Sequence, residues 1–251
     1  MIINIDGRDC VCEKGEFLLE VAERNGIFIP RFCHHPGLPG QASCRVCIVE
    51  VEARGYRQVV TSCVYPVDGE MTVYTKSDRI KKQRAMVLAL LCARAPESDR
   101  AAAMLKFAGA SAPERFSRIA DEKCIMCGLC ARACASVGAG AISTVGRGTD
   151  KKVATPYEAP SEDCIGCGSC AAVCPTSAID CAQDEDTRTI WGKSFALVKC
   201  ERCGQVAGTS EEIAFAAGKS GIDKSGVRPA TLCEACRKKA IADAMAVTYS
   251  R

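Results

Sequence analysis

Two copies of one cysteine pattern organise this sequence: CIMCGLCARAC at residues 124–134 and CIGCGSCAAVCP at residues 164–175. Each copy reads C-x2-C-x2-C-x3-C, and its first three cysteines are close enough for one tight loop to hold three corners of an iron–sulfur cubane. Gly128, Gly166 and Gly168 let such loops fold closely and leave backbone N–H groups free to donate to sulfur. Two complete copies argue against zinc binding or chance.

The fourth cysteine of each run is expected to bind the other cluster. The ligands predicted for the first [4Fe–4S] cluster, called site I below, are Cys124, Cys127, Cys130 and Cys174. Those predicted for the second, called site II, are Cys164, Cys167, Cys170 and Cys134. We expect each fourth cysteine to start the helix after its loop. Pro175 follows Cys174 as expected, whereas Ala135 replaces the proline after Cys134, which costs helix-start rigidity but no ligand.

A second cysteine group near the N-terminus reads Cys33-x10-Cys44-x2-Cys47-x15-Cys63. Its spacing differs from that of plant-type [2Fe–2S] proteins, but it has the same order of features: a long loop, a CxxC pair and a distant fourth cysteine. Around it, hydrophobic patterning predicts a β-grasp sheet over one helix. The predicted strands are residues 2–5, 9–13, 45–53, 58–63 and 71–74, and the predicted helix is 17–25. His34 and His35, beside the loop, are expected to pack or face solvent rather than bind iron.

The segment PRFCHHPGLPGQASCRVCIVEVEA, residues 30–53, resembles the [2Fe–2S] domain that begins the large iron–sulfur subunit of complex I. It equally resembles the start of [FeFe]-hydrogenases and the small iron–sulfur subunit of NAD-linked [NiFe]-hydrogenases. In those families the four cysteines are the cluster ligands, which implies Cys33, Cys44, Cys47 and Cys63 here.

The stretch from residue 124 to residue 180 is similar to the two-cluster domain of the same families. Many relatives carry a further [4Fe–4S] site, with one histidine and three cysteines as ligands, between the two regions. Residues 77–117 of this chain hold only Cys92 and no histidine. We therefore expect that cluster to be absent.

Two further CxxC pairs lie near the C-terminus. LVKCERCGQ, residues 197–205, looks like a zinc knuckle, and LCEACRKKAIADAMA, residues 232–246, places a pair at a helix start, where the helix dipole favours thiolate. Together they predict a zinc-ribbon or treble-clef-like module with one structural zinc, a further [4Fe–4S] cluster being the alternative. The predicted ligands are Cys200, Cys203, Cys233 and Cys236. The stretch between them, 204–226, is predicted to be a loop or weak hairpin.

Four cysteines remain, and all are predicted to be packing residues: Cys10, Cys12, Cys92 and Cys181. Cys10 and Cys12 are expected on opposite faces of a strand. The fold class is therefore α+β in four parts. These are a [2Fe–2S] β-grasp domain at 1–75, a helical hairpin linker at 76–117 with Ser77 as a helix N-cap, a bacterial-type 2[4Fe–4S] domain at 118–182, and a four-cysteine metal-binding module at 195–251.

Composition excludes several function classes. The formal charge is only +3, and cluster-bound thiolates would make the loaded chain acidic, so nucleic-acid binding is not expected. No apolar run approaches the roughly 20 residues that span a bilayer, and the N-terminus lacks a signal-peptide pattern. The expected compartment is the cytoplasm, where thiols stay reduced. There is no dinucleotide fingerprint, P-loop or Ser/His/Asp constellation, which favours a relay over a catalyst.

The resemblance implies an iron–sulfur electron-relay subunit of a multisubunit oxidoreductase. Its implied partners in a hetero-oligomer are a flavin subunit that exchanges electrons with NAD(P)H and a catalytic subunit of the hydrogenase or formate dehydrogenase type. Electron bifurcation would be an elaboration of that role. The alternative is a free-standing multi-cluster ferredoxin, against which the helical hairpin and C-terminal module argue. A zinc-dependent nucleic-acid module is disfavoured because no basic recognition helix follows the cysteines.

Overall fold

The computed structural model describes residues 1–112, 116, 122–220 and 231–249. Its contacts divide the chain into two compact units, interleaved in sequence. Unit 1 comprises residues 1–133, 144–153 and 173–178, and unit 2 comprises 134–143, 154–172 and 179–251. The four-part division above follows cysteine motifs instead. Its boundaries stay predictions, and the one at 117–118 lies outside the described residues.

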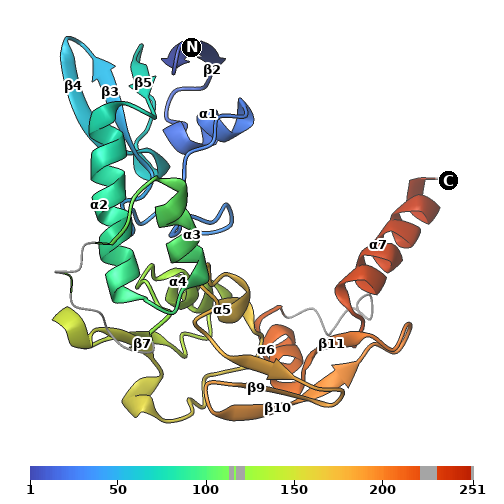
Figure 1. The fold of residues 1–251 in the computed structure, drawn as a ribbon. Helices are drawn as coiled ribbons and strands as arrows, with labels where there is room; N and C mark the ends of the chain where they lie inside the picture. Colours follow the sequence, from blue (N-terminus) through green and yellow to red (C-terminus); the bar gives the residue numbers. More distant parts are fainter. Residues whose placement is uncertain (113–115, 117–121, 221–230, 250–251) are drawn as a thin grey trace. The chain divides into compact units, whose positions relative to one another are not determined.

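Unit 1 contains a five-stranded sheet in the order β2-β1-β5-β3-β4 (Figure 1). Only β1 and β5 run parallel; the remaining neighbours are antiparallel. The strands are β1 (Ile2–Ile5), β2 (Arg8–Val11), β3 (Ile48–Ala53), β4 (Tyr56–Thr61) and β5 (Thr72–Tyr74). Every strand predicted here forms. The third begins three residues later than expected because Arg45, at φ 57°, belongs to the cysteine loop and is not extended.

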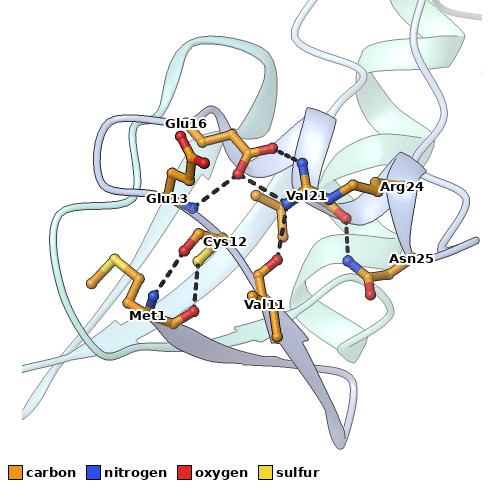
Figure 2. Close-up of polar contacts among 8 residues, drawn as sticks. All are labelled: Met1, Val11, Cys12, Glu13, Glu16, Val21, Arg24 and Asn25. Atoms are coloured by element: carbon orange, nitrogen blue, oxygen red, sulfur yellow. Dashed lines mark hydrogen bonds and ion pairs between the residues drawn. The ribbon is translucent and has the colours of Figure 1, made fainter.

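Helix α1 (Leu18–Arg24) packs its buried residues into the core that the sheet provides. Arg24 fixes its end by pairing with Glu16 and donating to the Val11 carbonyl at 2.9 Å (Figure 2). The amino group of Met1 donates to the Cys12 carbonyl at 2.9 Å, which closes the β1–β2 edge. These contacts hold the helix over the sheet as the predicted β-grasp requires.

The expectation for Cys10 and Cys12 was wrong. Residues two apart on a strand share a face, and both side chains point into the same core, 1% and 2% exposed. Burial raises the pKa of both thiols, so they behave as small apolar residues. Cys181, predicted to pack, is exposed instead, and Cys92 is half-buried.

The predicted helical hairpin is present as α2 (Asp78–Arg94) and α3 (Asp99–Phe107), which pack against each other. Ser77 is the N-cap of α2 as expected, its hydroxyl accepting from the Ile80 N–H at 3.3 Å. Ser98 caps α3 through the Ala101 N–H at 3.2 Å. Each cap satisfies an N–H that the first helical turn would otherwise leave unpaired.

The helices of the repeated motif begin one residue before the third cysteine of each run, not at the fourth cysteine as predicted. Helix α4 (Leu129–Val137) contains both Cys130 and Cys134, while α5 (Ser169–Ala172) ends before Cys174. Pro175 explains the shorter helix, because a proline disfavours helical backbone at the residue before it. Ala135, at the matching place, lets α4 continue through its cysteine.

Unit 2 contains a four-stranded antiparallel sheet in the order β11-β10-β9-β8. Its strands are β8 (Cys181–Gln183), β9 (Thr187–Ile190), β10 (Lys193–Lys199) and β11 (Val206–Thr209). Helix α6 (Ser210–Ser220) follows β11, and α7 (Glu234–Tyr249) comes later in the chain. A separate two-stranded sheet joins β6 (Ser143–Val145) and β7 (Lys152–Ala154). No helix in the described part of the chain is long and apolar enough to cross a membrane.

The loop or weak hairpin predicted over 204–226 was wrong for its described part, which forms β11 and the helix α6; residues 221–226 lie outside the described residues. A capping box was overlooked in the sequence. The Thr209 hydroxyl accepts from the Glu212 N–H at 3.0 Å, and the Glu212 carboxylate accepts from the Thr209 N–H at 3.4 Å. This reciprocal pair starts a helix despite the surrounding glycines.

Candidate metal centres

The N-terminal cysteine set lies buried in the loop before β3 and in the short turn after β4. Its members are Cys33, Cys44, Cys47 and Cys63. Their sulfurs are close enough to hydrogen-bond one another, which lowers the pKa of Cys47 to about 7 and raises that of Cys63. The Cys44 N–H also donates to the Cys33 sulfur at 3.4 Å. Four buried cysteines whose sulfurs interact in neighbouring pairs, with a backbone donor aimed at one of them, suit an anionic cluster.

A buried arginine from the linker holds this cysteine loop. Arg84, on α2, donates to the carbonyl oxygens of Val46 at 3.0 Å and Ile48 at 2.6 Å, the residues on either side of Cys47. It also donates to the Thr75 carbonyl at 3.2 Å. Burial lowers its pKa, but a guanidinium stays charged in proteins. A fixed positive charge therefore lies beside one predicted ligand.

The structure brings Cys174 to the first loop of the repeat, as the crossed ligand sets require. Burial chiefly raises the pKa values of Cys127 to about 11 and of Cys130 to about 12, and the neighbouring charge of Cys174 adds to both. Two backbone amides point at sulfur here: Met126 N–H to Cys124 at 3.4 Å and Ala178 N–H to Cys174 at 3.3 Å.

Site I and the N-terminal cysteine set touch within unit 1. The Ser43 hydroxyl, next to Cys44, donates to the Cys127 carbonyl at 3.0 Å. Arg132, on α4, donates to the Cys33 carbonyl at 2.7 Å and also contacts the Pro39 carbonyl. Ligands of both sites share one apolar cluster. The two loops are therefore direct neighbours.

Site II forms a separate pocket in unit 2, and Cys134 lies in it. One apolar cavity is lined by all four of its predicted ligands, together with Ile190 and Trp191. The Ala141 N–H donates to the Cys134 sulfur at 3.2 Å. Burial is the main cause that raises the pKa values of Cys164 and Cys170, and the charge of Cys134 contributes to each.

Side chains of β9 and β10 surround the site II loop, and sequence reasoning missed them. The Trp191 indole N–H donates to the Cys170 sulfur at 3.5 Å. Arg188 donates to the Gly166 carbonyl at 2.8 Å, and the Lys193 ammonium donates to the Cys164 carbonyl at 3.1 Å. The one available hint in the sequence was that the chain has a single tryptophan, placed soon after a cluster motif.

The C-terminal quartet is the most compact of the sets. All four sulfurs of Cys200, Cys203, Cys233 and Cys236 lie within 4.8 Å of one another. The first pair follows β10, where the Gly204 N–H closes a turn onto the Cys200 carbonyl at 2.9 Å, and the second pair flanks the start of α7. Backbone donors, led by Cys233 N–H, lower the pKa of Cys200 to about 6.

The two histidines remain peripheral. His35 Nδ1 accepts from the Gly37 N–H at 3.1 Å, so this ring serves a local turn. His34 Nδ1 is buried and has no hydrogen-bond partner in the described part of the chain. Burial lowers the pKa of His34, which favours the neutral ring.

Residues 1–78 match the family described as 2Fe-2S iron-sulfur cluster binding domain, and residues 117–183 match the 4Fe-4S dicluster domain. The chain thus contains both ferredoxin-type domains, in a mixed α+β structure. The expected resemblance is confirmed.

Relatives include two kinds of oxidoreductase subunit. The chain is 30% identical over 184 residues to the NADH-ubiquinone oxidoreductase 78 kDa subunit of Candida albicans, a match covering 62% of this chain and 25% of that one. It is 35% identical over 188 residues to the NADP-reducing hydrogenase subunit HndD of Solidesulfovibrio fructosivorans, covering 63% and 32%. The chain therefore spans about a quarter to a third of these relatives.

The solved structures include a similar chain in an NAD+-reducing [NiFe]-hydrogenase in the H2-reduced state. The TM-score is 0.61 at 25% sequence identity, and the match covers 70% of this chain and 85% of that one. The names of the two relatives describe a subunit of NADH-ubiquinone oxidoreductase and a subunit of an NADP-reducing hydrogenase.

Proposed function

We propose that the chain is an iron–sulfur electron-relay subunit of a multisubunit cytoplasmic oxidoreductase. In this proposal the N-terminal cysteines hold one [2Fe–2S] cluster, and sites I and II hold one [4Fe–4S] cluster each. The observation that carries it is the Ser43–Cys127 hydrogen bond of 3.0 Å, because it puts two cluster loops in contact. An electron could then move from one centre to the next through the protein interior.

The residues present fit the clusters they would hold. Cysteine sulfurs are the ligands that iron–sulfur clusters use, and at each site a backbone N–H donates to a ligand sulfur. When bound, the clusters supply one-electron carriage. The chain's own residues bind them, shield them from water by burial, and offset their negative charge with N–H groups and cations. Every predicted cluster ligand is a cysteine, as suits a carrier with no open coordination position.

The proposed partners follow from the division between two-electron and one-electron chemistry. Hydride exchange with NAD(P)H requires a cofactor such as a flavin, whereas cysteine-bound clusters carry single electrons. A flavin subunit would therefore meet NAD(P)H, and a catalytic subunit of hydrogenase or formate dehydrogenase type would lie at the other end. The names of the relatives and of the solved hydrogenase support such an assembly.

For the C-terminal quartet we propose one structural zinc. At a Zn–S distance of about 2.3 Å, tetrahedral geometry sets sulfurs roughly 3.8 Å apart. The Cys203–Cys233 sulfur distance is 3.6 Å, and no pair in the set exceeds 4.8 Å. A cubane would hold its ligand sulfurs farther apart, because each binds a different iron at a different corner.

Metal analysis under strict exclusion of air tests the cofactor assignment. The proposal predicts about ten irons and one zinc per chain, from one two-iron and two four-iron clusters. About fourteen irons and no zinc would show that the C-terminal quartet holds a further [4Fe–4S] cluster instead of zinc. In low-temperature EPR, Cys47→Ser should remove the [2Fe–2S] signal and leave the [4Fe–4S] signals; loss of every signal would contradict independent sites.

Purification of the native protein without a tag tests the role. The relay proposal predicts co-elution with a flavin-containing subunit in a complex well above 26.7 kDa. Addition of NAD(P)H should reduce the clusters in that complex and leave those of the separated chain oxidised. A lone species near the chain's own mass, with clusters intact, would instead identify a free carrier.

A further inference from the structure

The sheet that follows the dicluster domain contacts one of its two cluster loops, within unit 2. Residues 184 onward lie beyond the matched 4Fe-4S dicluster family, yet the β9–β10 hairpin supplies three side chains to the site II loop, one from each strand and one from the turn between them. Their donors reach the Cys170 sulfur and the carbonyls of Gly166 and Cys164. From β11, Thr209 adds a hydrogen bond of 2.5 Å to the Ile165 carbonyl.

We propose that Trp191 and Lys193 are positioning residues of site II that raise the reduction potential of its cluster. The claim rests on the proposed [4Fe–4S] cluster at that site. Reduction adds a negative charge to the cluster, and an N–H donor to a ligand sulfur stabilises the more negative state. The indole of Trp191 is such a donor, and the ammonium of Lys193 adds a nearby positive charge.

The backbone at Trp191 supports a functional reason for this residue. Trp191 and Gly192 form the two-residue turn between β9 and β10, and both have positive φ, 53° and 73°. Such turns favour Asn-Gly, and a bulky aromatic residue is strained at the first position. Trp191 thus adopts a backbone conformation that is unfavourable for its residue type, at the place where its indole contacts the Cys170 sulfur. Strain of this kind is expected at functional positions.

The packing around the loop fixes the donors in place. Phe195, 1% exposed, fills the space beside Gly166, where an added Cβ would lie 2.5 Å from the ring. The ammonium of Lys193 lies 4.9 Å from the centre of the Phe195 ring, a cation–π contact. It also reaches the Ser161 and Glu162 carbonyls, each at 3.4 Å. Lys193 is therefore held by several acceptors and a ring rather than free in solvent.

An EPR-monitored redox titration of the full chain, reconstituted with iron and sulfide, tests the proposal. Trp191→Phe removes the N–H but keeps an aromatic cover over the site. We expect one [4Fe–4S] midpoint potential to become more negative, with the other [4Fe–4S] and the [2Fe–2S] potentials unchanged. The shifted centre should be the one that Cys170→Ser removes. Lys193→Gln should move the same centre in the same direction.

Tyr157→Phe is the matched control, since Tyr157 is a fully exposed aromatic residue of unit 2. Iron content and melting temperature, measured on each variant, show whether a shift accompanies loss of structure. Unchanged potentials in both loaded variants, or equal shifts of both [4Fe–4S] centres, would overturn the proposal. A wild-type chain that binds no iron would instead overturn the proposed function on which it rests.

Discussion

Sites I and II share one motif but differ at the position before the second cysteine. Site I has Met126 there and site II has Gly166, and both backbones are left-handed, at φ 56° and 68°. In site II the side chain of Phe195 occupies the space that a Cβ would need. The motif therefore has a left-handed turn at this position in both copies. Glycine is required only at site II, because β10 packs Phe195 against that loop.

The helical positions after the third cysteine differ in the same way. Arg132 on α4 reaches the Cys33 carbonyl, while its counterpart in the second copy is Ala172, which has no such side chain. The two copies thus keep their ligands and diverge where each meets a neighbour: the [2Fe–2S] loop in unit 1, the β9–β10 hairpin in unit 2. Ligand spacing sets the kind of cluster, and the neighbouring element sets its surroundings.

The largest effect is expected for Gly166→Ala. The added methyl would meet the Phe195 ring at 2.5 Å on a backbone that is already left-handed. We expect the chain to lose about four of its roughly ten irons, those of site II. Iron analysis with EPR should show the [2Fe–2S] centre and one [4Fe–4S] centre remaining.

A double variant separates steric overlap from other causes. Phe195→Ala removes the ring that the new methyl would strike, so Gly166→Ala with Phe195→Ala should regain part of the lost iron. If the Gly166→Ala variant alone binds as much iron as wild type, the packing of β10 against this loop is not the reason that glycine occurs there.

Next in size is removal of the zinc proposed for the C-terminal cysteine quartet. Cys203→Ser should abolish zinc binding, and because zinc sites of this type stabilise a fold by about 10 kcal/mol or more, the end of β10 should loosen. Since β10 also carries Lys193 and Phe195, site II should release iron faster on exposure to a chelator. Site I, in unit 1, should release it at the wild-type rate, and equal acceleration of both would contradict the comparison.

In unit 1 the corresponding support is Arg84. Arg84→Met keeps much of the side-chain volume but leaves three carbonyls without their donor, at a cost of about 2–3 kcal/mol. Denaturant titration should show the [2Fe–2S] absorbance lost at lower concentration. Lys81→Met, which removes only an exposed ion pair with Asp78 on the same helix, is the control and should change little. A variant as stable as wild type would show that Arg84 does not hold the Cys47 loop.

The two ferredoxin-type domains and their order were readable from the sequence, because cluster-binding cysteines occur in fixed local spacings. The strands of the N-terminal sheet, the Ser77 cap and the helical hairpin were also predictable from alternation and capping residues. Two kinds of feature were not. One is the end of the helix that contains Cys134. Replacement of proline by Ala135 was expected to weaken a helix start, but it lets α4 continue through Cys134. The other is the region 204–220, which was predicted to be irregular because of its glycines. Thr209 and Glu212 form a capping box there and start a helix.

Long-range contacts were beyond the sequence for a physical reason. Arg84 lies 37 positions from Cys47 and Trp191 lies 21 from Cys170, and nothing in local spacing says which loop a distant side chain will meet. Their roles follow only once packing brings the donor to the carbonyl or sulfur. Local spacing therefore identifies candidate ligands, while the groups expected to tune them can be found only in the structure.

The smallest effect is expected for the reciprocal change, Met126→Gly at site I. Glycine would relieve a left-handed strain of about 1–2 kcal/mol, but it costs about 0.5–1 kcal/mol in backbone entropy and loses the packing of a half-buried side chain. We expect full iron content and a free energy of unfolding within about 1 kcal/mol of wild type, measured by denaturant titration. Because Gly166→Ala removes a glycine and Met126→Gly introduces one at the matching position, a large loss of site I iron would contradict the view that the motif itself accepts glycine there in both copies.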